Sequence, residues 1–147
     1  MRIVLQRVKK ASVTIDGSMV SRIGPGILIL LGVHRDDSAE HADFLAAKCA
    51  DVRIFNDEEG KMNRSLKDVG GAALVVSQFT LYGDCSKGRR PSFIEAAGPE
   101  KGDELYRYFV EQLKKQISIV ETGQFGAAME VTLINDGPVT LVLEKQA

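Results

Sequence analysis

Two segments of the chain consist almost entirely of apolar residues, and they constrain the fold more than any other feature. They read ILILLGV at positions 27–33 and AALVV at positions 72–76. Short apolar runs rich in branched side chains are typical of buried β-strands. Because the first run is apolar at every position, we expect it to be covered on both faces or to lie against a partner chain.

Other segments with alternating or β-branched patterns predict further strands. RIVLQRV and ASVTI are expected as two strands followed by a turn at Asp16-Gly17, with VSRI as the next strand. VRIF predicts a short strand before the turn NDEEGK. ISIVE, AAMEVTLI and VTLVLE predict the strands that finish the chain.

Two segments show the periodicity of amphipathic helices. Apolar residues recur at Ala42, Leu45, Ala46 and Cys49, and predict a helix over 38–51. Asp37 and Glu40, just before and within it, have the spacing of a capping box. A second helix after Pro99 is marked by Leu105, Phe109 and Leu113 with Tyr108 beside them, and lysines near its end favour the helix C-terminus.

Strands grouped in runs, with two helices between them, predict the α+β class. We expect a curved, mostly antiparallel, barrel-like sheet with two main helices. The length of 147 residues suits a single domain spanning residues 1–147.

Composition restricts the cellular setting and the partners. No apolar run approaches the length of a membrane span, and the N-terminal segment lacks the pattern of a signal peptide, so a cytoplasmic protein is expected. The two cysteines, Cys49 and Cys85, predict neither a disulfide nor a zinc site. With a net charge of −1, any contact with nucleic acid should be local.

The usual catalytic side chains are scarce. His34 and His41 are expected to have surface or capping roles, and no nucleophile elbow, P-loop or zinc-protease motif is present. We expect no metal and no cofactor. An enzyme built from this chain would have to rely on something other than a conventional triad.

One polar interruption occurs in SQFTL, at positions 77–81, where an apolar strand acquires an amide and two hydroxyls. If the strand continued to alternate, Gln78 and Thr80 would point together into one pocket, while Ser77 and Phe79 would share the other face. Such groups need partners, and a ligand is one possibility. Cross-strand hydrogen bonds at a strand end are the alternative.

A second interruption is NDGPVT, at positions 135–140. Asn-Asp-Gly between alternating segments predicts a tight hairpin turn, yet Pro138 stands where the second strand should begin and cannot donate to a ladder. A cis peptide is accessible before proline, and a cis Gly137-Pro138 unit would present carbonyl oxygens on a small rigid surface. Alone the motif is weak, because Gly-Pro also occurs at 24–25 and 98–99.

Together these segments resemble the D-aminoacyl-tRNA deacylases, also called D-tyrosyl-tRNA deacylases. The resemblance rests on SQFTLYGD and NDGPVT, with MRIVLQRVKKASVT and GKMNRSL, and extends over essentially the whole chain. It implies hydrolysis of the ester between a D-amino acid, or glycine, and the terminal adenosine of tRNA. It also implies a homodimer with active sites at the subunit interface, where Gly-Pro of one chain reaches the pocket of the other.

The resemblance assigns roles to the two interruptions. An aminoacyl ester is already activated and its ribose carries a vicinal hydroxyl, so Ser77, Gln78, Thr80 and nearby backbone N–H groups need only position it and stabilise the oxyanion. Thr80 as a covalent nucleophile is an alternative without a recognisable base. Gly137 and Pro138 would hold the substrate's amino group and exclude an L side chain.

The resemblance also points to GQFGAAM, at positions 123–129, as the adenosine site. Phe125 could stack on the base and Met129 could line the pocket, although Phe125 could equally be a core or interface residue. The cluster Lys87, Arg89 and Arg90 could contact acceptor-end phosphates, or could be a solvated basic loop.

Two rival functions remain at this stage. A non-catalytic module could bind tRNA ends or a small ligand in the same pocket, and it would protect a charged tRNA instead of hydrolysing it. A general esterase could use Ser77 or Thr80 as its nucleophile, and would then lose all activity in Thr80→Ala.

Overall fold

The sheet is organised around one long strand, β1 (Arg2–Ile15). The computed structural model describes residues 1–146. Along one edge, β1 pairs antiparallel with β3 (Gly26–Gly32) and then with β2 (Ser18–Ile23); along the other it pairs with β8 (Glu130–Glu144). The expected break between RIVLQRV and ASVTI is wrong, because partners on both edges keep the strand continuous. The turn at Asp16-Gly17 is confirmed, with positive φ at both residues.

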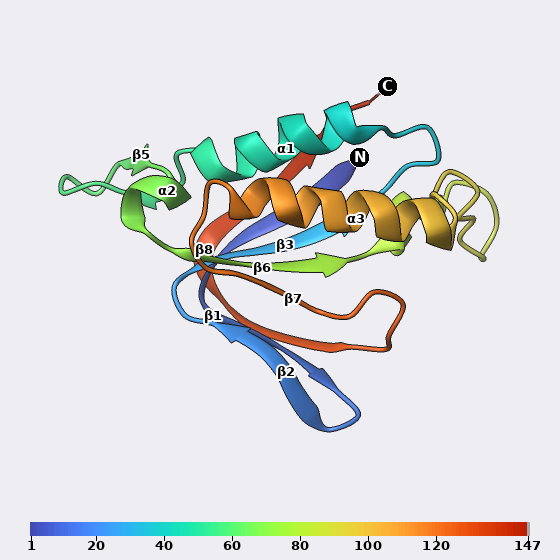
Figure 1. The fold of residues 1–147 in the computed structure, drawn as a ribbon, viewed down its shortest axis with the longest axis horizontal. Coiled ribbons are helices and arrows are strands. Elements are labelled where there is room, and N and C mark those ends of the chain that lie inside the picture. Colours follow the sequence, from blue (N-terminus) through green and yellow to red (C-terminus); the bar gives the residue numbers. More distant parts are fainter. Residues whose placement is uncertain (147) are drawn as a thin grey trace.

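The remaining strands of the main sheet are parallel to their neighbours. β6 (Ala72–Ser77) pairs with β3, and β7 (Val120–Thr122) pairs with β6. The sheet runs in the order β2-β1-β3-β6-β7, with β8 beside β1, and it curls into a nearly closed barrel. The expected α+β class with a curved, mostly antiparallel sheet is confirmed (Figure 1).

The hairpin predicted at NDGPVT is wrong. β8 does not reverse there, because β1 is long enough to pair with both of its halves: Val8 lies opposite Asn135 and Gln6 opposite Thr140. Residues 136–139 therefore bulge out opposite the single residue Arg7. The Gly137–Pro138 peptide bond within the bulge is cis, and both residues are exposed.

Two hydrophobic cores lie on opposite faces of the sheet. β3 contributes Ile27, Ile29 and Leu31 to the core under the helices, and Leu28 to the core inside the curled sheet. The expectation that ILILLGV is covered on both faces is confirmed within one chain, except at Leu30, which is half-buried. The second core also contains residues of β1, β2 and β6, with Met129, Val131 and Leu133 packed against it.

The two main helices lie side by side over one face of the sheet (Figure 1). They are α1 (Ala39–Asp51) and α3 (Pro99–Lys114). The stripes predicted for both are buried, but in α3 it is Tyr106, and not Tyr108, that enters the core. Among residues 1–146, no helix is long and apolar enough to cross a membrane.

The capping box predicted from Asp37 and Glu40 is wrong. Ser38 is the N-cap of α1, and its backbone N–H donates to Nδ1 of His41 at 2.9 Å. Asp37 is instead buried, where it accepts hydrogen bonds from the α-ammonium of Met1 and the backbone N–H of His34, each at 2.7 Å. A carboxylate with these two partners is not available to cap a helix.

Small elements fill the segment between α1 and β6. The predicted strand VRIF is reduced to β4 (Phe55–Asn56), which pairs with β5 (Met62–Arg64). The short helix α2 (Leu66–Val69) has no counterpart in the sequence prediction. Its signal was the capping box of Ser65 and Asp68, which exchange two hydrogen bonds.

Candidate functional site

The segment SQFTL begins at the end of β6. Ser77 is the last strand residue, opposite Leu31 of β3, and the N–H of Gln78 still donates to the carbonyl of Leu31 at 2.8 Å. The chain then turns into a 3-10 helix, η1 (Phe79–Tyr82). The strand alternation assumed for Phe79 and Thr80 is therefore wrong, because β3 ends here and offers no further partner.

Gln78 and Thr80 nevertheless come together, as the sequence predicted. The side-chain amide of Gln78 donates to the hydroxyl oxygen of Thr80 at 2.5 Å. The first hydrogen bond of η1 runs from the N–H of Leu81 to the carbonyl of Gln78, so the N–H groups of Phe79 and Thr80 precede the helical bonding. Polar side chains and backbone donors are thus gathered in four residues.

A cavity of about 590 Å³ lies beside this segment. It brings the SQFTL motif together with the GQFGAAM motif, because both contribute to its wall. Its lining comprises Val76, Ser77, Gln78, Phe79, Phe93, Ala96, Ala97, Gly98, Pro99, Phe125, Gly126, Ala127, Met129 and Val131. Thr80 does not line the cavity itself, but its hydroxyl is hydrogen-bonded to Gln78, which does.

Phe125 and Met129 lie on the segment that joins β7 to β8. The turn between them contains Gly126 at φ +79°, and the N–H of Ala127 donates to the carbonyl of Gln124 at 3.2 Å. Phe125 is half-buried against Tyr106, with ring centroids 6.0 Å apart. One face of this aromatic ring is thereby fixed to α3, and the ring forms part of the cavity wall.

The cavity lining contains no ionisable side chain. Its polar groups are the hydroxyl of Ser77, the amide of Gln78 and the backbone. A site of this composition can bind an apolar or aromatic group and orient a neutral ester through dipoles, but it offers no general base of its own.

The two histidines lie outside this cavity. His41 caps α1, and His34 accepts the N–H of Asp36 through Nδ1 at 3.0 Å and packs edge-on against Tyr82. The prediction of surface or capping roles for both is confirmed.

Gly137 and Pro138 do not line the cavity, so one chain does not unite the two predicted motifs. They belong to the bulge of β8, whose base is fixed by side chains. Asn135 donates its amide to the carbonyls of Arg7 and Val139, at 3.0 and 3.1 Å. Thr140 follows the bulge and accepts a hydrogen bond from Gln6 at 3.2 Å, as a strand threonine.

Sequence reasoning missed the part of the cavity wall formed by Phe93 and the residues after it. Phe79 and Phe93 pack edge to face with centroids 5.2 Å apart, and the segment after Phe93 continues the wall. The available signal was the aromatic residue in the loop between η1 and α3. This loop also carries Lys87, Arg89 and Arg90, all exposed, so the basic cluster and the cavity wall are parts of one segment.

Reciprocal backbone bonds close the base of that basic loop. The N–H groups of Asp84 and Ser92 donate to each other's carbonyls at 2.7 and 2.9 Å. The Asp84 carboxylate accepts the N–H of Ser86 at 2.9 Å, and hydrogen bonds from Ser86 lower the pKa of Asp84 below its usual value. The loop is thus anchored where it leaves η1.

Comparison with known proteins places these features in a family. The family model described as D-Tyr-tRNA(Tyr) deacylase matches residues 4–144. A D-aminoacyl-tRNA deacylase of Exiguobacterium sibiricum is 60% identical over 145 residues, covering 99% of this chain and 100% of the relative. One of Bacillus cereus is 56% identical over 146 residues, with the same coverage.

Two solved structures share the fold. A structure named c-Myc DNA Unwinding Element Binding Protein is 41% identical, with a TM-score of 0.95 and full coverage of both chains. Another, named a probable eukaryotic D-amino acid tRNA deacylase, is 20% identical with a TM-score of 0.81 over 97% of both chains, and supports the fold alone. The chain belongs to the D-aminoacyl-tRNA deacylase family of ester hydrolases.

Proposed function

We propose that this protein hydrolyses the ester bond of D-aminoacyl-tRNA, and of glycyl-tRNA, to release free tRNA and the amino acid. The observation that carries the proposal is the uncharged cavity beside residues 77–80, in a chain 60% identical to a D-aminoacyl-tRNA deacylase. The proposed place of action is the cytoplasm.

The terminal adenosine of the tRNA occupies the cavity in this proposal. Phe125 offers an aromatic face for the base, and Met129 offers a polarisable side chain that adapts to it. Gly123 supports the arrangement, because a Cβ there would lie 2.5 Å from the sulfur of Met129. Glycine at this position leaves Met129 its place in the wall.

The ester then lies beside Ser77, Gln78 and Thr80. The N–H groups of Phe79 and Thr80 stabilise the oxyanion, and the vicinal ribose hydroxyl of the RNA assists the attacking water. The hydrogen bond between Gln78 and Thr80 fixes both side chains in this arrangement. Positioning by the protein and assistance by the RNA together replace a catalytic triad.

The active site is completed by a second copy of the chain, as a homodimer. One sheet face beside the cavity leaves apolar side chains uncovered: Val142 is 65% exposed and Phe79 is 56% exposed, with half-buried Val4 and Leu30 between β8 and β6. Association through this face would cover them and bring the exposed Gly137 and Pro138 of the second copy to the cavity.

Selection against L-amino acids is assigned to Gly137 and Pro138. Their backbone would hold the amino group of the substrate and occupy the space that an L side chain needs, which is selection by steric conflict. Glycine has no side chain, so it would be accepted. The side chain of a D-amino acid points away, which accounts for tolerance of different amino acids.

The basic loop supplies the contact with the acceptor-end phosphates. Lys87, Arg89 and Arg90 are exposed on the segment that leads into the cavity wall. A local cluster of this kind is compatible with RNA binding by a chain whose net charge is −1.

The test is the deacylation rate of matched D-tyrosyl-tRNA and L-tyrosyl-tRNA, with glycyl-tRNA and the variant Pro138→Ala in parallel. We expect rapid loss of the D-ester and of the glycyl ester, a stable L-ester, and reduced selectivity in the variant. Equal hydrolysis of both tyrosyl esters would instead identify a general esterase. Tight binding without turnover would identify a binding module.

The dimer has its own test. Val142→Lys places a charge on the uncovered sheet face, and should give a monomer in sedimentation equilibrium that has lost deacylation. Ile119→Lys is the matched control, because Ile119 is 54% exposed but precedes β7, away from β8. A monomeric wild-type protein with full activity would overturn the two-chain site.

A further inference from the structure

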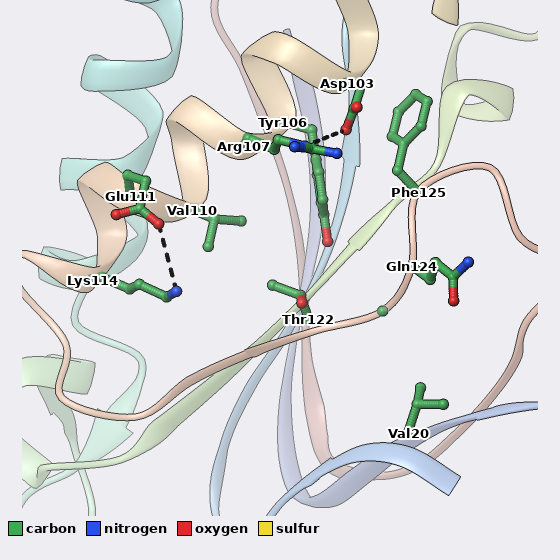
Figure 2. A pocket seen from close by; sticks show the side chains of 11 residues that line it. Val20, Asp103, Tyr106, Arg107, Val110, Glu111, Lys114, Thr122, Gln124 and Phe125 are labelled. Carbon is green, nitrogen blue, oxygen red and sulfur yellow. Dashed lines mark hydrogen bonds and ion pairs between the residues drawn. The ribbon is translucent and has the colours of Figure 1, made fainter. Parts of the chain in front are cut away.

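A second cavity adjoins the first and has no role in the function proposed so far. Its volume is about 690 Å³, and it lies between α3 and the strand β7 with its following loop. Phe125 lines both cavities, so they adjoin at this aromatic ring. Figure 2 shows Phe125 and Gln124 on the loop after β7, and Asp103 and Arg107 on α3.

The lining of this second cavity differs from that of the first. Beside apolar residues it contains ionisable and amide groups: an amide at Gln124, carboxylates at Asp103 and Glu111, and cations at Arg107 and Lys114. Val20 of β2 stands on the opposite side (Figure 2). The cavity therefore offers hydrogen-bond acceptors and positive charges in the same lining as the Phe125 ring.

Tyr106 contributes a buried, neutral group to the lining. The hydroxyl of Tyr106 donates to the carbonyl of Val75 at 2.8 Å. Burial raises the pKa of Tyr106 to about 12, so the hydroxyl stays protonated. Recognition of a ligand is left to the groups on the rim.

The charged groups on the rim are held only loosely. Arg107 pairs with Asp103 at 3.0 Å and Lys114 pairs with Glu111 at 3.6 Å, but the Arg107 side chain is 75% exposed and Lys114 is 50% exposed. Exposed pairs of this kind contribute little to stability. An incoming phosphate can therefore take over a cation at small cost.

We propose that this second cavity binds the cytidine nucleotide that precedes the terminal adenosine of the tRNA. The inference rests on the proposed function, in which adenosine fills the first cavity against Phe125. tRNAs share the 3′ sequence C-C-A, so a cytidine precedes the terminal adenosine whatever amino acid is attached. Cytosine presents an exocyclic amine, which carboxylate and amide oxygens accept, and its phosphate is matched by Arg107.

The chemistry of each lining residue determines which part of the cytidine nucleotide it contacts. Gln124 and Asp103 read the base, Arg107 binds the phosphate between the two nucleotides, and Phe125 lies between the two cavities, where it stacks on the adenine only. Enzyme contacts to an unstacked RNA end commonly combine such stacking with recognition of base edges.

The test uses D-tyrosine esterified to adenosine, to cytidylyl-adenosine, and to a dinucleotide with an abasic ribose before the adenosine. We expect kcat/KM for the cytidylyl ester to exceed that for the adenosine ester by about 10-fold or more, with the abasic ester between them. In Arg107→Gln the abasic ester should lose its advantage in kcat/KM over the adenosine ester, which is due to the phosphate. In Gln124→Ala the cytidylyl ester should lose its advantage over the abasic ester, which is due to the base. Arg53→Gln, a change at an exposed arginine outside the cavity, should leave all ratios unchanged.

The readout is the ratio between substrates, so a general loss of activity in a variant does not imitate the result. Equal kcat/KM for the adenosine and cytidylyl esters would overturn the cytidine site and leave the deacylase intact. Absence of hydrolysis of every ester, D-tyrosyl-tRNA included, would instead overturn the proposed function. A gain that survives both Arg107→Gln and Gln124→Ala would also overturn the assignment to this cavity.

Discussion

Arg7 and Asp136 connect the hydrophobic core beneath the helices to the bulge of β8. Nε of Arg7 donates to the backbone carbonyl of Asp136 at 3.2 Å and lies 3.2 Å from its carboxylate. Nη1 of the same guanidinium donates to the carbonyl of Ile54 at 2.6 Å, and Arg7 is buried. The segment that carries Gly137 and Pro138 is thus held from inside the protein.

Replacing this arginine should therefore affect both stability and catalysis. In Arg7→Met the buried carbonyl of Ile54 loses its donor, and we expect the free energy of unfolding to fall by about 1–3 kcal/mol. Deacylation should fall about 10-fold or more, with reduced discrimination between D and L esters, because the bulge is no longer held. Urea unfolding and parallel rate measurements would check this.

Asp136→Asn is the matched control for that change. It keeps the backbone carbonyl that Arg7 contacts and removes only the charge, so its effect should be smaller in both measurements. An Arg7→Met protein with normal rates and normal selectivity would contradict the positioning role.

Thr80→Ala separates positioning from nucleophilic catalysis. The hydroxyl of Thr80 accepts the amide of Gln78, and among the described residues no histidine contacts it. We expect a loss of about 10-fold in kcat/KM for D-tyrosyl-tRNA, the size of one lost hydrogen bond. Activity reduced to background in a correctly folded variant would identify Thr80 as the nucleophile.

Gly26 is required by the close approach of two strands. A Cβ at this position would overlap the backbone carbonyl of Ala72, its partner at the start of the β3-β6 pair. We expect Gly26→Ala to prevent folding or to lower the melting temperature severely. Gly24→Ala, where a Cβ meets nothing within 4 Å, should change thermal stability little. Similar melting curves for the two variants would contradict this packing.

The carboxylate of Asp57 should titrate below its usual range. Its pKa is lowered first by the hydrogen bond from the side chain of Asn63, at 2.9 Å, and next by the N–H of Lys61. Because the pKa of Asp57 is lower in the folded state, its ionised carboxylate stabilises the fold at pH values above the unfolded pKa, which is near 3.8. This contribution is lost as the pH falls through the pKa of the folded state.

Side-chain carbon NMR titration would measure this shift. In Asn63→Ala the pKa of Asp57 should rise toward 3.8, while that of Asp68, lowered by hydrogen bonds from Ser65, should stay where it is. An unchanged Asp57 titration in the variant would show that Asn63 is not the main cause.

Patterns along the sequence were sufficient to predict the elements that are defined by the spacing of their own apolar residues. The stripe from Ala42 to Cys49 specified α1, and the run at 27–33 specified a strand covered on both faces. Burial of apolar groups dominates there, and it leaves a regular signal in the chain.

The errors arose where pairing with a strand distant in the sequence determines the backbone conformation. Asn135-Asp136-Gly137 has the local chemistry of a hairpin, but β1 pairs with the strand on both sides of it, so the turn becomes a bulge. Likewise, SQFTL stops being a strand because the pairing of β6 with β3 ends at Ser77 and Leu31. Tertiary pairing is not visible in local propensity.

Individual residues of the candidate site could be predicted from the sequence, but their arrangement around the cavity could not. Gln78 and Phe125 were each identified from short motifs, and the cavity unites their segments. The aromatic pair of Phe79 and Phe93 depends on a loop between η1 and α3 that has no periodic pattern. Packing across such a loop cannot be read from spacing along the chain.

The pairing of β1 with β8 also sets an order of events during synthesis. Arg2 lies opposite Glu144 and Thr14 opposite Glu130, so every pair joins residues separated by roughly a hundred positions or more. A growing chain can form the β1-β2 hairpin early, but the other edge of β1 stays open until the last strand leaves the ribosome. The strand that is made first is therefore the one whose hydrogen bonds are completed last.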